Sequence, residues 1–172
     1  CPHCFTTLKN DYSELGADLD VVHHSQFIGQ LVSEGKIKPK SWMDEDVTYH
    51  DACYLGRHND EYDAPRDVIQ SVMRDGELKE MEQSKSESFC CGAGGGNMWY
   101  EIKTGERINQ NRVKQAVSTD AKTVAAACNF CNIIQADHLG SLLLPMLGDN
   151  IENNYFEDTD LKMKELYVHD SL

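Results

Sequence analysis

Five cysteines are spaced in a way that suits a metal cluster. Cys53 is followed by the adjacent pair Cys90 and Cys91, and this pair by Cys128 and Cys131, with 36 residues in each of the two long gaps. Iron–sulfur centres generally take four thiolate ligands, so five cysteines are enough. Four of them could instead close a tetrahedral zinc site, and a Cys-x-x-Cys pair also supports thiol redox chemistry. The adjacent pair favours a cluster of several metal atoms over a single zinc ion.

Glycines and histidines stand next to these cysteines. Gly92 and Gly94 belong to a glycine-rich run and would let backbone N–H groups approach an anionic cluster, where such hydrogen bonds tune its potential. The run lacks the Gly-Lys-Ser/Thr ending of a phosphate loop, so we do not expect nucleotide binding. His50 and His58 flank Cys53 and are candidates for hydrogen bonds to cluster sulfurs or for proton transfer. A purely structural role is the alternative for both.

The elements that must position these residues alternate between short apolar runs and amphipathic helices. The Cys-x-x-Cys pair stands at an expected helix start, where amide N–H groups stabilise thiolates. The expected strands cover residues 19–24, 47–50, 78–81 and 123–127. The expected helices cover residues 25–35, 63–72, 98–117 and 128–144, with a weaker helix at 161–167.

This alternation predicts an α/β fold with a mostly parallel sheet and flanking helices. Ligands of such sheets bind beyond the carboxyl ends of the strands. All five cysteines come shortly after expected strands, and each long gap has room for a crossover that returns the chain to the same edge. We therefore expect the cluster site on the carboxyl-end rim of the sheet. Trp99 and Tyr100 would pack the long helix.

Composition narrows the function classes. The chain has 172 residues, seven cysteines and a formal net charge of −13, which argues against nucleic acid and anionic membrane surfaces as direct partners. No apolar run in this segment is long enough to span a membrane. An odd number of cysteines without a secretion signal favours metal ligands over disulfides. The chain starts inside a motif and without Met, so we expect a piece of a longer protein.

Three segments carry a family resemblance. Residues 50–57 read His-Asp-Ala-Cys-Tyr-Leu-Gly-Arg, residues 89–96 read Phe-Cys-Cys-Gly-Ala-Gly-Gly-Gly, and residues 127–131 read Ala-Cys-Asn-Phe-Cys. They resemble the H-D-P-C-x-L-G/A-R, C-C-G-A-G-G and C-P-x-C segments of the cysteine-rich CCG domain. That domain occurs in a cysteine-rich subunit of heterodisulfide reductase and in the iron–sulfur subunits of glycolate and lactate oxidases. Ala52 and Asn129 replace the usual prolines and remove no ligand.

The family carries two such motifs in tandem. By this resemblance, Cys1 and Cys4 close a first, truncated site whose other cysteines lie upstream. The five later cysteines would hold a [4Fe–4S]-type cluster, cubane or noncubane, although one motif holds zinc in some relatives. Residues 1–45 would end the first CCG half-domain, residues 46–147 would form the second, and residues 148–172 would be an acidic C-terminal tail.

The resemblance implies an iron–sulfur subunit of an oxidoreductase. Electrons would pass through the cluster between a flavoprotein or ferredoxin-type subunit and an acceptor such as a quinone or a disulfide. We expect a cytoplasmic protein, either free or on the cytoplasmic face of a membrane complex. On the cysteines alone, two alternatives stay open: a zinc-stabilised interaction domain without catalysis, and a thiol–disulfide oxidoreductase.

Overall fold

A four-stranded parallel sheet forms the centre of the computed structural model, which describes residues 1–100, 104–135 and 162–165. β1 (Val47–His50) lies between β2 (Leu78–Lys79) and β3 (Thr123–Ala126). β4 (Lys162–Glu165) pairs with the other side of β3. The predicted α/β fold with a mostly parallel sheet is confirmed.

The two central strands bring distant parts of the chain to one edge. Every residue of β1 and of β3 is buried, as is typical of a parallel sheet that is covered on both faces. Val47 pairs with Thr123, and His50 pairs with Ala126, so the two strands end level with each other. The segments that leave β1 and β3, and that carry the expected ligands, therefore start side by side.

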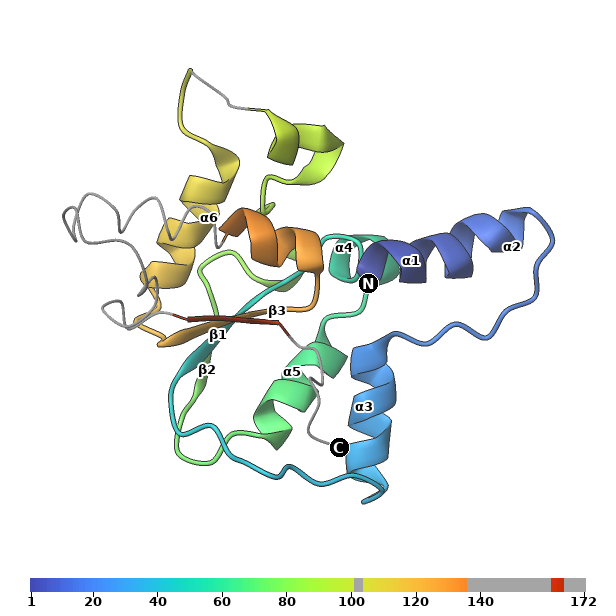
Figure 1. Ribbon diagram of the computed structural model, residues 1–172, viewed down its shortest axis with the longest axis horizontal. Coiled ribbons are helices and arrows are strands. Elements are labelled where there is room, and N and C mark those ends of the chain that lie inside the picture. The colour runs from blue at the N-terminus through green and yellow to red at the C-terminus, as the bar shows by residue number, and fades with distance from the viewer. Residues whose placement is uncertain (101–103, 136–161, 166–172) are drawn as a thin grey trace.

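Helices cover both faces of this sheet. Figure 1 shows α5 (Asp63–Ser71) on one face with α3 (His24–Ser33) packed beside it, and α6 (Ile108–Val117) on the other face together with a helix at residues 129–135. The shorter elements are α1 (Pro2–Thr6), the π-helix η1 (Thr7–Asp11), α2 (Tyr12–Glu14), α4 (Gly56–Asn59) and the 3₁₀ segments η2 (Lys85–Glu87) and η3 (Gly94–Trp99).

The strand predicted at residues 19–24 is wrong. Leu19 and Val22 are each 51% exposed, residues 17–23 form no regular element, and α3 starts at His24. Apolar and β-branched residues form a strand only where a neighbouring strand can pair with them, and this segment has none among the described residues. His23 becomes the N-cap of α3, because its ring accepts a hydrogen bond from the backbone N–H of Ser25.

The helix predicted over residues 98–117 is also wrong, because only α6 forms. Gly105 has a φ of 76°, in the left-handed region that an α-helix excludes, and Arg107 is extended. Trp99 and Tyr100 consequently pack no long helix and are 79% and 68% exposed.

The C-terminal expectations fare differently. The weak helix predicted at 161–167 is wrong where the structure describes it, because residues 162–165 form β4 on the otherwise open edge of β3. The end of the helix expected to reach residue 144 and the tail segments 148–161 and 166–172 lie outside the described residues. The half-domain boundaries stay a prediction. Among the described helices, none has the length and apolar character to cross a bilayer.

Candidate metal-cluster site

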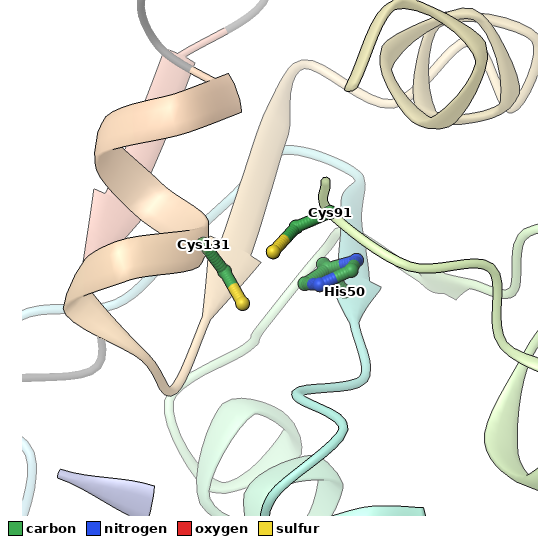
Figure 2. A group of neighbouring side chains, drawn as sticks. All are labelled: His50, Cys91 and Cys131. Carbon is green, nitrogen blue, oxygen red and sulfur yellow. The ribbon is translucent and has the colours of Figure 1, made fainter. Parts of the chain in front are cut away.

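Three buried side chains converge at the carboxyl edge of the sheet. His50 is the last residue of β1, Cys91 lies in the loop before η3, and Cys131 lies in the helix at 129–135. One ligand atom from each lies within 4.8 Å of the other two. Figure 2 shows the two sulfur atoms and the imidazole ring facing one another beside the ends of β1 and β3. A site on the carboxyl-end rim is therefore what the fold provides.

The other three expected ligands lie around this group. Cys90 precedes Cys91, and its sulfur accepts a hydrogen bond from the backbone N–H of Gly92 at 3.3 Å. Cys128 is buried and is hydrogen-bonded to Cys131. Cys53 is half-buried and senses the charges of Cys91 and Cys128. All seven cysteines are free thiols, so every one of the five sulfurs is available to a metal.

The thiols divide into stronger and weaker acids. Hydrogen bonds from Cys131 and Cys90, and a weaker one from His50, hold the pKa of Cys91 far below its usual value although burial opposes this. A hydrogen bond from Cys131 lowers the pKa of Cys128 to about 7. The pKa values of Cys131 and Cys90 rise because each donates to a neighbouring thiolate. Thiolates are the ligating form, so a metal would displace the remaining protons.

Cys53 is separated from the buried group by a small hollow. Burial raises the pKa of the Cys53 thiol. The hollow has about 250 Å³ of space free of protein atoms and opens between the loop after β1 and the loop before η3. Arg57 lines it and donates to the backbone carbonyl of Ser88 at 2.7 Å, which ties the two loops together. The hollow is lined by His50, Asp51, Ala52, Cys53, Arg57, Tyr62, Lys85, Ser88, Phe89, Cys90 and Cys91.

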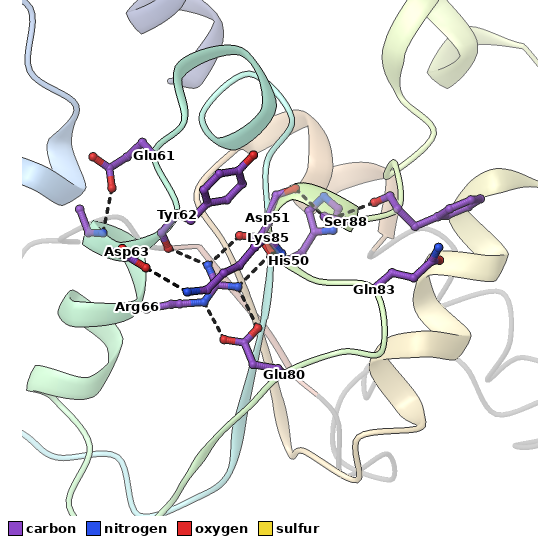
Figure 3. Close-up of polar contacts among 12 residues, drawn as sticks. His50, Asp51, Glu61, Tyr62, Asp63, Arg66, Glu80, Gln83, Lys85 and Ser88 are labelled. Carbon is purple, nitrogen blue, oxygen red and sulfur yellow. Dashed lines mark hydrogen bonds and ion pairs between the residues drawn. The ribbon is translucent and has the colours of Figure 1, made fainter.

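A buried ion-pair network fixes the loop after β1. Arg66 on α5 donates to both oxygens of Asp51, at 2.7 and 2.9 Å, and to both oxygens of Glu80, at 2.6 and 2.8 Å. It also donates to the carbonyl of Tyr62. The backbone N–H of Lys85 donates to Asp51 at 2.8 Å, so the segment that leads to Cys90 is held by the same carboxylate (Figure 3).

A second buried arginine stands behind His50. Arg112 on α6 is 0% exposed and donates from Nε to His50 Nδ1 at 2.8 Å. Its Nη atoms donate to the carbonyl of Gln83, to Gln115 Oε1 and to Ser88 Oγ. Burial lowers the pKa of Arg112 to about 10, which leaves it charged at neutral pH. Burial also lowers the pKa of His50, so its ring is neutral there.

The two glycines expected at the cluster differ in their surroundings. Gly92 is buried with a φ of 89°, and a Cβ there would meet the Asn109 backbone nitrogen at 3.0 Å and the Ile108 Cβ at 3.1 Å. Its N–H donates to a cysteine sulfur, as a cluster-lining glycine should. Gly94 is exposed, and no atom lies within 4 Å of a Cβ built on it. Of the two, only Gly92 is required by the local packing.

His58 lies apart from the buried group. It is exposed on α4 and stacks on Tyr54 with ring centroids 4.6 Å apart. The structure therefore brings His50 to the sulfurs and leaves His58 on the surface beside them. Cys4 is exposed, and the structure places it among the residues of α1.

His3 joins the N-terminal segment to the cluster site. Its Nδ1 lies 3.8 Å from the Cys1 sulfur and 4.0 Å from the Cys128 sulfur. Its ring packs on Tyr54 at 4.1 Å and edge-on against Phe130 at 5.1 Å. The first Cys-x-x-Cys segment therefore lies directly against the second site.

Sequence reasoning missed both His3 and Arg112. The four buried residues of α6 are spaced three, four and seven positions apart from the first, as one helix face requires. That spacing places Arg112 on the core face and could have identified it as a buried cation. For His3, only its position inside Cys-Pro-His-Cys was informative. The four buried residues are Asn109, Arg112, Val113 and Ala116.

Comparison with known proteins agrees with this arrangement. The chain is 38% identical over 157 residues to a probable iron-sulfur-binding oxidoreductase FadF of Bacillus subtilis, covering 91% of the chain and 20% of that protein. It is 42% identical over 144 residues to the EtfAB:quinone oxidoreductase of Syntrophomonas wolfei, covering 80% of the chain and 20% of that protein. It is 36% identical over 167 residues to a subunit of the dihydromethanophenazine:CoB--CoM heterodisulfide reductase of Methanosarcina mazei, covering 95% and 41%.

The chain thus spans between a fifth and two fifths of the length of these three relatives. No solved structure matches it. Residues 47–134, about half of the chain, match the cysteine-rich domain family CCG, and they contain all five cysteines of the site. The chain therefore belongs to the CCG cysteine-rich domain family.

Proposed function

We propose that the chain is part of an iron–sulfur oxidoreductase subunit and that its five cysteines carry electrons through a [4Fe–4S]-type cluster. The observation that carries this proposal is the convergence of thiols from three separate segments at one buried edge of the sheet. Membership of the CCG family and the names of the relatives, which are iron–sulfur and oxidoreductase proteins, support it.

The donor set suits such a cluster. Cys91 and Cys131 offer sulfur within 4.8 Å of each other, and Cys90 and Cys128 are bonded to them. Soft thiolates select iron–sulfur centres over hard cations. The sheet edge is buried, and the Gly92 N–H already donates to a cysteine sulfur. When bound, the cluster would supply one-electron chemistry, while the protein sets its potential through these contacts.

Partners follow from the relatives. We infer an electron-transfer flavoprotein or ferredoxin-type donor, and a quinone or a disulfide as acceptor, because one relative is named an EtfAB:quinone oxidoreductase and another belongs to a heterodisulfide reductase. Cytoplasmic placement, free or against a membrane complex, is part of the same proposal.

The test is anaerobic purification of the full-length protein with iron and sulfide analysis and EPR. Cys91→Ser and Cys131→Ser should each abolish the signal of this site and remove about four iron atoms per chain. Cys4→Ser is the matched control, because Cys4 is exposed and belongs to the other expected site, so the signal of this site should persist. The EPR spectrum would also separate a cubane from a noncubane cluster.

A zinc site is the second candidate, since His50, Cys91 and Cys131 would suit it geometrically. Colourless protein that retains one tightly bound zinc ion and no iron after anaerobic reconstitution would refute the iron–sulfur proposal. A titratable dithiol without any metal would instead indicate a thiol–disulfide oxidoreductase.

A further inference from the structure

The hydrogen bond between Arg112 and His50 fixes which ring nitrogen carries the proton. Arg112 Nε lies 2.8 Å from His50 Nδ1, and both residues are at most 1% exposed. A guanidinium group has five N–H donors and no acceptor. His50 Nδ1 must therefore accept this bond with its lone pair. A neutral imidazole has one N–H, so the proton of His50 stands on Nε2.

This tautomer is the wrong one for a metal ligand. A histidine that ligates through Nε2 donates its Nδ1–H to a carboxylate, a carbonyl or water. Here Nδ1 faces a donor, and ligation through Nε2 would set two N–H groups against each other. The Nε2–H can instead donate to the Cys91 sulfur, with which His50 is hydrogen-bonded. The close approach of His50 to the two cysteines thus has an explanation other than metal binding.

The charge of Arg112 points to the same site. Its four hydrogen bonds go to a ring nitrogen, a carbonyl, an amide oxygen and a hydroxyl. Among the described residues, no carboxylate lies within ion-pair distance of its guanidinium group. A buried cation without a counter-charge is costly. The anionic groups that it senses include the thiols of Cys91 and Cys131, so a thiolate-ligated cluster would compensate it.

We propose that Arg112 is a positioning residue that holds His50 as the Nε2–H tautomer, so that His50 donates to the Cys91 sulfur and leaves metal ligation to the cysteines. This inference rests on the proposed function, because it concerns the same cluster. Gln83, Ser88 and Gln115 hold the arginine in place and have no direct part in it.

The first test needs no substitution in the wild-type sample. Full-length protein with its cluster is labelled with [¹⁵N]histidine, and the reduced state is studied by pulsed EPR. The inference predicts only the weak nitrogen couplings that pass through a hydrogen bond. A coupling of directly bonded strength that disappears in His50→Leu would show that His50 is a ligand and would overturn the inference.

The second test is a double-mutant cycle on the midpoint potential of the cluster. Hydrogen bonds to cluster sulfurs stabilise the more negative, reduced state. His50→Leu and Arg112→Met should therefore both lower the potential. If Arg112 acts through His50, the double variant should be no lower than the lower of the two single variants.

The alternative outcome of this cycle is equally specific. Shifts that add up in the double variant would mean that Arg112 acts by its charge alone, which contradicts a positioning role. Gln115→Ala is the matched control, because it removes one hydrogen bond from the same guanidinium group and leaves the bond to His50 intact. Its potential should equal that of the wild type.

The two levels of inference fail differently. Protein without iron and sulfide would refute the proposed function before any potential is measured. Protein with a full cluster and a directly bonded histidine, or with additive shifts, would overturn only the role of Arg112 and His50.

Discussion

Removing Arg66 should destabilise the protein far more than removing an exposed arginine. Arg66 and Asp51 have side chains that are 6% and 3% exposed and are joined by two hydrogen bonds. In Arg66→Met, the Asp51 carboxylate would stay buried with the Lys85 N–H as its one remaining described donor. Breaking a buried ion pair by removing one partner costs about 3–5 kcal/mol.

The other bonds of Arg66 change this figure little. Glu80 is 40% exposed, so water can replace its two bonds, and an exposed pair of this kind contributes about 0–1 kcal/mol. We expect a total loss of about 3–5 kcal/mol of unfolding free energy, or about 6–20 °C in Tm for a domain of this size.

Arg74→Met provides the matched control. Arg74 also forms a two-bonded pair with an aspartate, Asp44, but the two side chains are 56% and 45% exposed. Its removal should cost about 0–1 kcal/mol. Urea unfolding of the variants under anaerobic conditions, followed by pulse proteolysis, would compare them at equal cluster content.

Two outcomes would refute the reasoning. Arg66→Met could unfold at the same urea concentration as Arg74→Met, which would mean that the buried network contributes no more than a surface pair. The double variant Asp51→Asn/Arg66→Met should be more stable than Arg66→Met, because no charge is then left unpaired. A double variant that is less stable would contradict the assignment of the cost to the buried carboxylate.

Two further predictions concern the glycine loop and a buried histidine. Gly92→Ala should cost at least about 1–2 kcal/mol and lower the iron content, because its φ is 89° and α6 lies against it, whereas Gly94→Ala should stay within about 0.5 kcal/mol of the wild type in the same unfolding assay; equal effects would contradict the packing argument. Burial and the neighbouring His24 lower the pKa of His23 to about 3 from 6.5, so its contribution to stability is complete above about pH 6.5 and is lost as the pH falls towards 3. The unfolding free energy should fall by at most about 1 kcal/mol per pH unit below 6.5, and His23→Asn, which keeps an N-cap acceptor, should remove this part of the slope when measured at pH 7 and pH 5; an unchanged slope would refute it.

The parts of the fold that could be predicted from the sequence are those with a local cause. β1 and β3 are short runs rich in β-branched and apolar residues, and α5 starts at Asp63 with Pro65 in its first turn. The failures arise where a partner decides. Residues 19–24 have strand-forming composition but pair with no described strand, and residues 162–165 become a strand because the edge of β3 accepts them.

The candidate site divides in the same way. Cysteine spacing and the rule for parallel sheets are enough to predict that the thiols gather on one edge. The hydrogen bonds that organise this edge could not be predicted, because they join residues that are distant in sequence. Arg112 meets His50 across 62 positions, and Lys85 meets Asp51 across 34. Pairings of that kind depend on the assembled core and leave no short motif.

The register of the two central strands has a consequence for the order in which this protein matures. β1 pairs with β3, although β2 and α6 stand between them in the chain, so the central pairing closes a long loop and forms late. A growing polypeptide exposes Cys53, Cys90 and Cys91 before Cys128 and Cys131 have been synthesised. The complete ligand set exists only after β3 has docked, so cluster insertion must follow the folding of the sheet.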